Sequence, residues 1–496
     1  MESSSSGYVC AAGDTLTALM GHFIDLSNGS YLNDDQFSQF LSNTVDKFLY
    51  SFGANVDYQR KKLADNHAEK FLKVIKFILK RPFMKNIKLY LDSGGFQVAQ
   101  GAFLPKDIPV FTDLWYNTVK ENPNLFSYAF IQDIPPGPAS AELFNSYKEI
   151  EDLNRESYLK CKKILPADIV RDKIIYIHHF RTPSLFDIWH RFLFEENLAE
   201  GFTYFGTGGI VAQLATDTDK PFILYVIPLN SMIQYAKMKN IKQMKFHILG
   251  GANFIDVFYH QLFSYHIKQY HKIDIDITYD STALFKGLSL GRFVQVVNPL
   301  GCLEKMDLRS AELQRRWHDD TIENYCYKIT NDVATRHNFK LLTKEKDPIY
   351  DERNTLSRSI HMYLMAYMLD FYKLMEAFAI NEVHRIYPIY LAGEKERKHF
   401  NEECYEIVRK LNQGKESTKQ FHKSQSIYNS LKILEKADLD WSRQIVEKTL
   451  FKDDIQELKG TDGGGRNPKI HNMYIPSKKK EKELKPANLD VPKIWS

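Results

Sequence analysis

The chain has few cysteines and no long apolar run. Its five cysteines, among 496 residues, are odd in number and include no C-x-x-C pair, which argues against a disulfide framework and a compact zinc site. No apolar stretch reaches the roughly 20 residues of a membrane helix. Residues 1–6 are acidic and serine-rich, unlike the basic and apolar run of a signal peptide. We therefore expect a protein of the reducing cytoplasm that binds no membrane.

The chain also lacks a large excess of positive or negative charge. With 66 Lys and Arg against 62 Asp and Glu, the net charge is +4. No overall basic field therefore indicates nucleic acid, and binding of that kind must come from a local patch. The chain is instead rich in apolar and aromatic residues, with 44% hydrophobic residues, 33 Phe and 28 Tyr. This composition predicts a globular protein with a large core.

Short apolar runs recur between about 85 and 300, each followed by a mixed segment of helical length. The runs are Ile87–Leu91, Ser127–Ile131, Ile174–Ile177, Phe202–Phe205, Lys245–Leu249, Ile273–Thr278 and Phe293–Val297. Strands separated by helices predict parallel βα units, and this many units favour an α/β fold of the (β/α)8 TIM-like barrel type. A doubly wound open sheet is the alternative. The strands before residue 85 cannot be placed from the sequence.

The character of the chain changes after about residue 345. Apolar residues at three- and four-residue spacing predict a long helix over 355–387, and 400–450 resembles two or three more helices. From residue 459 onward nine Lys and Arg stand against four acids, which predicts a basic flexible tail or a phosphate-binding arm. The expected organisation is a barrel over 1–345, a mainly helical extension over 346–458 and a basic tail over 459–496.

Carboxylates follow three of the predicted strands. Asp92, Asp133 and Asp280 each stand at a strand's carboxyl end, and in a barrel these ends converge on the face that carries active sites. Three glycine pairs fall on the same rim: Gly94–Gly95, Gly208–Gly209 and Gly250–Gly251. Glycines leave room for a planar ring against the backbone, and carboxylates would accept hydrogen bonds from its N–H groups. The rim therefore suits a purine.

Paired carboxylates also suit displacement at a glycosidic carbon. One can attack C1′ as a positive, oxocarbenium-like centre develops, while the other handles protons. The set therefore predicts an enzyme that breaks an N-glycosidic bond. The structural alternatives are plain ones: Asp92 and Asp133 can cap a helix or a turn, and Asp280 can be a solvated strand end.

The run Asp92-Ser93-Gly94-Gly95-Phe96-Gln97 matches the DSGGFQ signature of the tRNA-guanine transglycosylase superfamily. The segment 205–210 resembles the glycine loop of that superfamily, 248–251 resembles its later strand end, and Tyr279-Asp280 falls where it has its nucleophile. These pieces follow the superfamily's order and spacing over about 80–300. The resemblance implies a (β/α)8 barrel that exchanges guanine in a polynucleotide for a 7-deazaguanine.

The resemblance also implies roles for individual residues. Asp280 would be the nucleophile that forms a covalent sugar–enzyme intermediate, and Asp92 the general acid and base. Asp133 would bind the base beside the backbone of Gly208 and Gly209. His178 stands near the place of a base-binding Gln, a departure that leaves the base preference open. The other base-binding positions are Ser93, Gly94, Phe96 and Gly250.

The chain departs from the tRNA-acting members in two ways. Bacterial tRNA enzymes carry a C-x-C-x-x-C zinc motif plus a His after the nucleophile. Here the candidate ligands after Asp280 are Cys302 and Cys326, which lie far apart, together with His318 and His337. We expect no structural zinc and no other cofactor. The run 281–286 also lacks the Pro-Thr-Arg of tRNA-acting enzymes. These departures favour the DNA-modifying paralogues, the 7-deazaguanine DNA transglycosylases of phages and bacteria.

The expected function is the exchange of guanine in DNA for a 7-deazaguanine, with the free base as second substrate. Exchange in tRNA is the alternative, and a non-catalytic barrel subunit that binds nucleic acid is an alternative of another class. A duplex substrate would require the target nucleotide to be flipped out of the stack. The sequence does not determine the oligomeric state, and a homodimer is one expectation.

Overall fold

The computed structural model describes most of the barrel and the helices that follow it. The described residues are 7–11, 46–55, 66–80, 82–99, 101–102, 104–135, 144, 146–180, 182–208, 225–251, 253–281, 293–297, 303–307, 355–412 and 418–448. Gly209 and the predicted basic tail over 459–496 lie outside these ranges.

Eight parallel strands form a closed barrel in which each strand pairs with the next one along the chain. They are β1 (Tyr8–Cys10), β2 (Lys47–Ser51), β3 (Lys88–Asp92), β4 (Tyr128–Phe130), β5 (Ile174–His178), β6 (Tyr204–Thr207), β7 (Gln243–Ile248) and β8 (Asp274–Ser281). The barrel closes where β8 pairs in parallel with β1, with Val9 opposite Asp280. The predicted (β/α)8 architecture is confirmed, and the open-sheet alternative is wrong.

The barrel differs from the prediction at both ends of the strand series. Its first two strands, β1 and β2, precede the region in which strands could be recognised. At the other end, Phe293–Val297 was expected to be a last strand of the barrel. It is β9 instead, and it forms a separate antiparallel pair with β10 (Leu303–Asp307). Because β8 already pairs with β1, the barrel has no free edge for a further strand.

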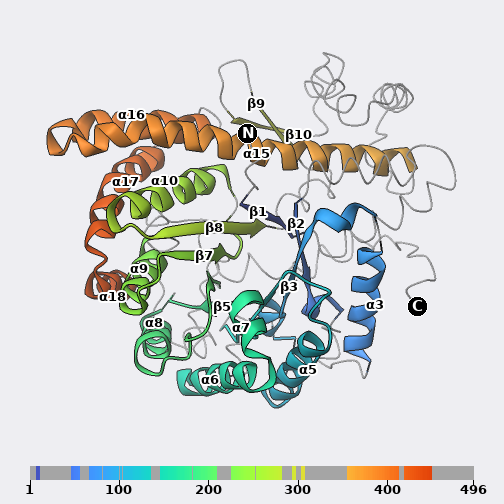
Figure 1. The fold of residues 1–496 in the computed structure, drawn as a ribbon. Coiled ribbons are helices and arrows are strands. Elements are labelled where there is room, and N and C mark those ends of the chain that lie inside the picture. Colours follow the sequence, from blue (N-terminus) through green and yellow to red (C-terminus); the bar gives the residue numbers. More distant parts are fainter. Residues whose placement is uncertain are drawn as a thin grey trace, which may run out of the picture.

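Helices surround the barrel and separate its strands (Figure 1). They are α3 (His67–Leu79), α4 (Gly95–Ala99), α5 (Ile108–Glu121), α6 (Tyr147–Ile164), α7 (Ala167–Lys173), α8 (Pro183–His190), α9 (Ile227–Lys239) and α10 (Phe254–His271). Short helical turns accompany them: η1 (Phe52–Asn55), η2 (Pro82–Asn86), η3 (Pro105–Asp107) and η5 (Arg191–Glu195). In α3 the buried residues Phe71, Ile75 and Ile78 recur every three or four positions. This spacing places one apolar face on the barrel.

In the described part of the chain four helices follow the barrel, as the sequence predicts for this region. They are α15 (Thr355–Leu391), α16 (Arg397–Leu411), α17 (Thr418–Lys436) and α18 (Leu439–Lys448), with the turn η9 (Glu394–Glu396) before α16. Helix α15 packs on α10, and α18 packs on α8 and α9. Figure 1 shows α17 and α18 on the α8–α10 side of the barrel, and α15 running from that side past β1 and β2. The extension therefore covers one side of the barrel rather than standing apart from it.

Buried side chains connect the extension to the barrel, and Glu376 and His266 are two of them. Glu376 of α15 accepts hydrogen bonds from the Gly7 amide (2.8 Å) and from the Tyr279 hydroxyl on β8. His266 of α10 lies 3.0 Å from the Leu431 carbonyl of α17 and 2.9 Å from the Tyr387 hydroxyl of α15. Because a carbonyl only accepts, Nε2 of His266 carries the hydrogen, and burial lowers the pKa of this histidine to about 4. A neutral histidine therefore connects three helices.

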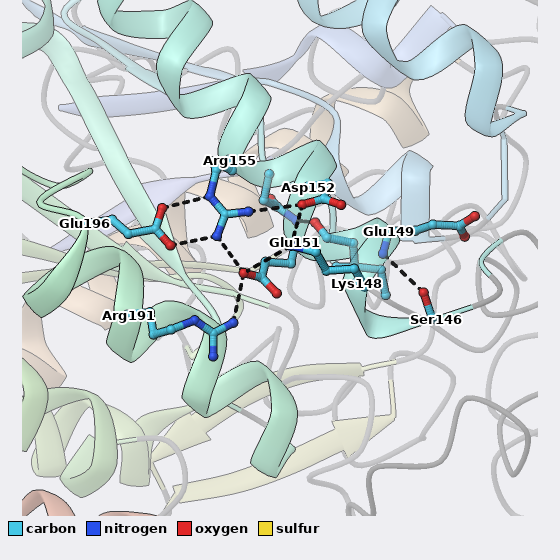
Figure 2. Close-up of polar contacts among 10 residues, drawn as sticks. Ser146, Lys148, Glu149, Glu151, Asp152, Arg155, Arg191 and Glu196 are labelled. Atoms are coloured by element: carbon cyan, nitrogen blue, oxygen red, sulfur yellow. Dashed lines mark hydrogen bonds and ion pairs between the residues drawn. The ribbon is translucent and has the colours of Figure 1, made fainter.

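A network of charged side chains connects α6 to η5 on the outside of the barrel (Figure 2). The Arg155 guanidinium donates two hydrogen bonds to Glu196, of 2.6 and 2.7 Å, and one of 2.6 Å to Glu151. Arg191 forms an ion pair with the same Glu151 oxygen at 2.9 Å. Hydrogen bonds from arginine hold the pKa of Glu196 below its usual value, and they do the same for Glu151 against its burial.

We expect Arg155→Gln to lower the free energy of unfolding by about 1–2 kcal/mol at pH 7, because the carboxylates of Glu151, Asp152 and Glu196 all lose a hydrogen-bonding partner. Since the folded-state pKa of both glutamates is lowered, this stabilisation is present above their unfolded pKa and is lost as the pH falls through the folded value. Urea unfolding at pH 7 and pH 4 measures both effects. The matched control is Arg171→Gln, which removes an exposed pair with the adjacent Asp172. An equal effect of the two substitutions would contradict the network.

Candidate active site

Asp92 stands at the end of β3, where the parallel register places Ser51 of β2 beside it. The Ser51 hydroxyl donates a 2.6 Å hydrogen bond to Asp92 Oδ2. Burial raises the pKa of Asp92 from 3.8 to about 6, against the lowering effect of the Ser51 hydrogen bond. The negative charges of Asp133 and Asp280 raise it further. The structure therefore brings the three predicted carboxylates into one electrostatically coupled group, and it gives Asp92 the pKa of a proton-transfer group near neutral pH.

The turn after Asp92 depends on its two glycines for different reasons. Gly94 has a φ of +94°, which side chains other than glycine rarely adopt. Gly95 has no space for a side chain, because a Cβ there would lie 2.5 Å from Asp133 Oδ1. The glycine pair thus lets the backbone of one strand end lie directly against the carboxylate of the next. Phe96 lies in α4, but the position of its side chain is outside the described part of the structure.

Ser93 lies between Asp92 and these glycines and is fully buried. Within the described residues its hydroxyl has no hydrogen-bond partner. Buried polar groups in folded proteins are nearly always hydrogen-bonded. An unsatisfied hydroxyl at the carboxyl end of β3 is therefore a candidate contact for a bound ligand, and the base-binding role expected of Ser93 stays a prediction.

Asp133 follows β4 and is paired with a histidine. Its Oδ2 lies 2.8 Å from His179 Nε2, while His179 Nδ1 lies 3.0 Å from the Gly208 carbonyl oxygen. Because that carbonyl only accepts, Nδ1 carries a hydrogen, and a second proton must lie between Nε2 and Asp133. His179 therefore connects the strand ends of β4 and β6, and it orients Asp133 with Oδ1 against Gly95.

The histidine assignment from the sequence needs a correction. The base-binding role was expected of His178, whereas in the structure its neighbour His179 contacts Asp133. His178 belongs to β5 and packs near Phe180 and Phe246, and burial lowers its pKa to about 3. Side chains alternate along a strand, so His178 and the residue that follows it face opposite sides. His179 replaces His178 as the candidate histidine of the site.

Asp280 lies near the end of β8 and is held through one of its two oxygens. Oδ1 accepts a 2.8 Å hydrogen bond from the Gly250 amide and lies 3.2 Å from His247 Nε2. Among the described residues no hydrogen bond reaches Oδ2, and the side chain keeps 12% of its exposure. Asp280 therefore has one oxygen fixed by the protein and one available to a ligand. Gly250, expected to contact the base, uses its amide for Asp280.

Three side chains around the carboxylates were not identified as site residues from the sequence: Ser51, His179 and His247. Ser51 ends a strand that the sequence did not reveal. His247 lies inside an apolar run of β7, where the alternation of side chains is hidden because both faces of a barrel strand are buried. The sequence places His178 and His179 at a strand end. It does not show which of the two faces the carboxylates, because that depends on where the strand ends.

The described residues contain no group of three or more His, Cys, Asp or Glu arranged to hold a metal ion. The residues considered for zinc, Cys302, Cys326, His318 and His337, lie outside the described ranges. In the same described part of the chain, no helix is both long and apolar enough to cross a membrane. Comparison of the chain with protein-family models, with curated proteins and with solved structures gave no match in any of the three.

Proposed function

We propose that this protein is a base-exchange glycosyltransferase that replaces guanine in DNA by a 7-deazaguanine through a covalent bond between Asp280 and the sugar. The observation that carries the proposal is the pairing of unlike carboxyls at one end of the barrel. Asp280 Oδ2 accepts no hydrogen bond from the residues that the structure describes, whereas Asp92, whose pKa the charge of Asp280 helps to raise, has a pKa of about 6. One carboxylate suited to attack and one carboxyl suited to proton transfer are the requirements of a retaining displacement.

The chemistry runs in two balanced halves. In the first, Asp280 Oδ2 forms a bond to C1′ while the bond from C1′ to guanine N9 breaks, and Asp92 supplies the proton that the departing base needs. In the second, Asp92 takes a proton from the incoming 7-deazaguanine, whose N9 bonds to C1′ as the bond to Asp280 breaks. Both groups return to their initial state, and the chain's own side chains perform every step without a cofactor.

Recognition of the base is assigned to the Asp133 side of the site. Asp133, oriented by His179, can accept hydrogen bonds from the N1–H and the exocyclic amine of a guanine. The unsatisfied Ser93 hydroxyl lies two residues before Gly95, which adjoins Asp133. These groups favour a ring with adjacent donors, a feature that guanine and 7-deazaguanines share and adenine lacks.

DNA is favoured over RNA by the sequence: the chain lacks both the Pro-Thr-Arg run after the nucleophile and the C-x-C-x-x-C motif of the tRNA-acting enzymes. Phosphate contacts would come from basic side chains around the site and from the tail over 459–496. The alternative function, base exchange in tRNA, would use the same active-site chemistry on a different polymer.

Incubation with radiolabelled guanine and separate pools of duplex DNA and tRNA tests the proposal. We expect label to enter DNA, and unlabelled 7-deazaguanines to compete with it. Label in tRNA alone would move the substrate to RNA. If neither polymer is labelled and both are bound, the protein belongs to the non-catalytic class of nucleic-acid-binding barrels, and the proposed activity is wrong.

A further inference from the structure

A chain of hydrogen bonds runs through the barrel interior to Asp280. It joins four buried side chains from four strands: Tyr90 of β3, Tyr204 of β6, Thr278 of β8 and His247 of β7. The Tyr90 and Tyr204 hydroxyls are 3.4 Å apart, and Tyr204 lies 2.5 Å from the Thr278 hydroxyl. Thr278 in turn lies 2.8 Å from His247 Nδ1, and His247 Nε2 lies 3.2 Å from Asp280 Oδ1.

With a neutral imidazole at His247, the chain can be hydrogen-bonded in a single direction. Oδ1 of Asp280 already accepts the Gly250 amide hydrogen, so as a carboxylate oxygen it also accepts from His247, whose hydrogen must then lie on Nε2. His247 Nδ1 is therefore an acceptor and takes the hydrogen of the Thr278 hydroxyl. That hydroxyl has no second hydrogen, so Thr278 accepts from Tyr204, and Tyr204 accepts from Tyr90. Each donor selects the orientation of the next.

The surroundings of His247 fix its ring as well as its tautomer. The side chain is fully buried, with Phe130 at 5.1 Å and Tyr90 at 6.2 Å between ring centroids. The parallel register places His247 directly beside Thr278 on the neighbouring strand. A ring held on several sides loses little further freedom when it binds Asp280, so the hydrogen bond is preorganised before substrate arrives.

We propose that His247 is a positioning residue, held as the Nε2–H tautomer by Asp280 and Thr278 together, that fixes Asp280 through Oδ1 and leaves Oδ2 as the attacking oxygen. The catalytic part of this proposal rests on the proposed function; the tautomer does not. The His247 side chain is fully buried and therefore has no surface open to a substrate. It acts through Asp280, as the carboxylate of a hydrolase triad acts through its histidine.

The substitution Thr278→Val tests the chain while leaving His247 and Asp280 in place. In the wild type, the nitrogen chemical shifts of histidine-labelled protein should show His247 protonated on Nε2, with His247→Gln identifying the signal. In Thr278→Val the share of the Nδ1–H tautomer should rise, because Nδ1 has lost its donor and Asp280 alone then favours Nε2–H. We expect kcat for base exchange to fall roughly 10- to 100-fold, the loss usual for a group that orients an active-site side chain, with KM nearly unchanged.

Thr118→Val is the matched control, since Thr118 is as buried as Thr278 (5% and 4% exposed) but bonds a carbonyl within its own helix. It should leave both the His247 signal and kcat unchanged. A second series removes the donor itself: His247→Gln keeps an amide hydrogen for Asp280 and should retain more activity than His247→Leu.

The outcomes separate the two proposals. An Nδ1–H tautomer in the wild type, or equal activity of His247→Gln and His247→Leu, overturns the positioning role. An Nε2–H tautomer that depends on Thr278, in a protein that exchanges no base in DNA or tRNA, supports the hydrogen-bond chain and overturns the proposed function alone.

Discussion

Replacing Asp280 by asparagine is expected to abolish base exchange, with a loss of at least about 10⁴-fold in kcat, because an amide cannot form the ester-like bond to C1′ that the proposed mechanism needs. The amide oxygen can still accept from the Gly250 amide and His247, so the fold should be preserved. The measurement is incorporation of labelled guanine into duplex DNA, with the melting temperature recorded alongside.

The matched control for Asp280→Asn is Asp274→Asn on the same strand. Asp274 makes an exposed ion pair with Lys268 at 2.7 Å, at the opposite end of β8 from Asp280. The Asp274→Asn variant should exchange guanine at the wild-type rate. Retention of exchange by Asp280→Asn would show that another group is the nucleophile.

Asp92→Asn is expected to lower kcat about 10²- to 10⁴-fold, the usual contribution of general acid–base catalysis. In the wild type kcat/KM should fall as the pH rises above about 6, the pKa to which burial raises Asp92, because departure of guanine needs the protonated form. This limb should vanish in the variant, whose amide does not titrate. A pH series of exchange rates on both proteins measures the effect.

The same substitution should stabilise the protein at pH 8. Because the folded-state pKa of Asp92 lies near 6 rather than 3.8, its favourable contribution to stability is complete below pH 3.8 and is lost as the pH rises through 6. An uncharged amide escapes this penalty, so unfolding of Asp92→Asn should cost on the order of 1–2 kcal/mol more at pH 8. Lower activity with higher stability would distinguish a lost proton donor from a damaged fold.

Ser51→Ala provides a finer control of the Asp92 assignment. The Ser51 hydrogen bond lowers the pKa of Asp92, so its removal should raise that pKa and shift the basic limb of kcat/KM to higher pH while the carboxyl remains. A limb that stays in place when Ser51 is altered would mean that a different group titrates.

The strands that could be predicted from the sequence are those that show a local pattern of apolar residues. Each strand from β3 to β8 is an apolar run that ends in small or polar residues, and such runs can be read one at a time. Strand β1 has three residues, and its place depends on pairing with β8 at the far end of the barrel. For the same reason Phe293–Val297 looked like a barrel strand: nothing local shows that the barrel has already closed.

The candidate site divides in a similar way. Asp92, Asp133 and Asp280 could be predicted because each follows a strand, and the barrel topology then brings strand ends together. Their partners His179 and His247 could not be predicted. Whether each histidine contacts a carboxylate depends on which face of the strand its side chain occupies, and the sequence does not show this. The pairing of His179 with Gly208 and the chain from Tyr90 to His247 join residues on different strands, and such contacts exist once the barrel has formed.

The most direct test of the account is the identity of the residue that bonds to the sugar. Wild-type protein would be incubated with guanine-containing DNA without an incoming base, denatured, digested with nuclease and protease, and analysed by mass spectrometry. The account predicts a deoxyribosyl adduct on the peptide that contains Asp280, absent from Asp280→Asn and removed when a 7-deazaguanine is added before denaturation. An adduct on Asp92 or any other residue, or base exchange that proceeds without an adduct, would contradict it.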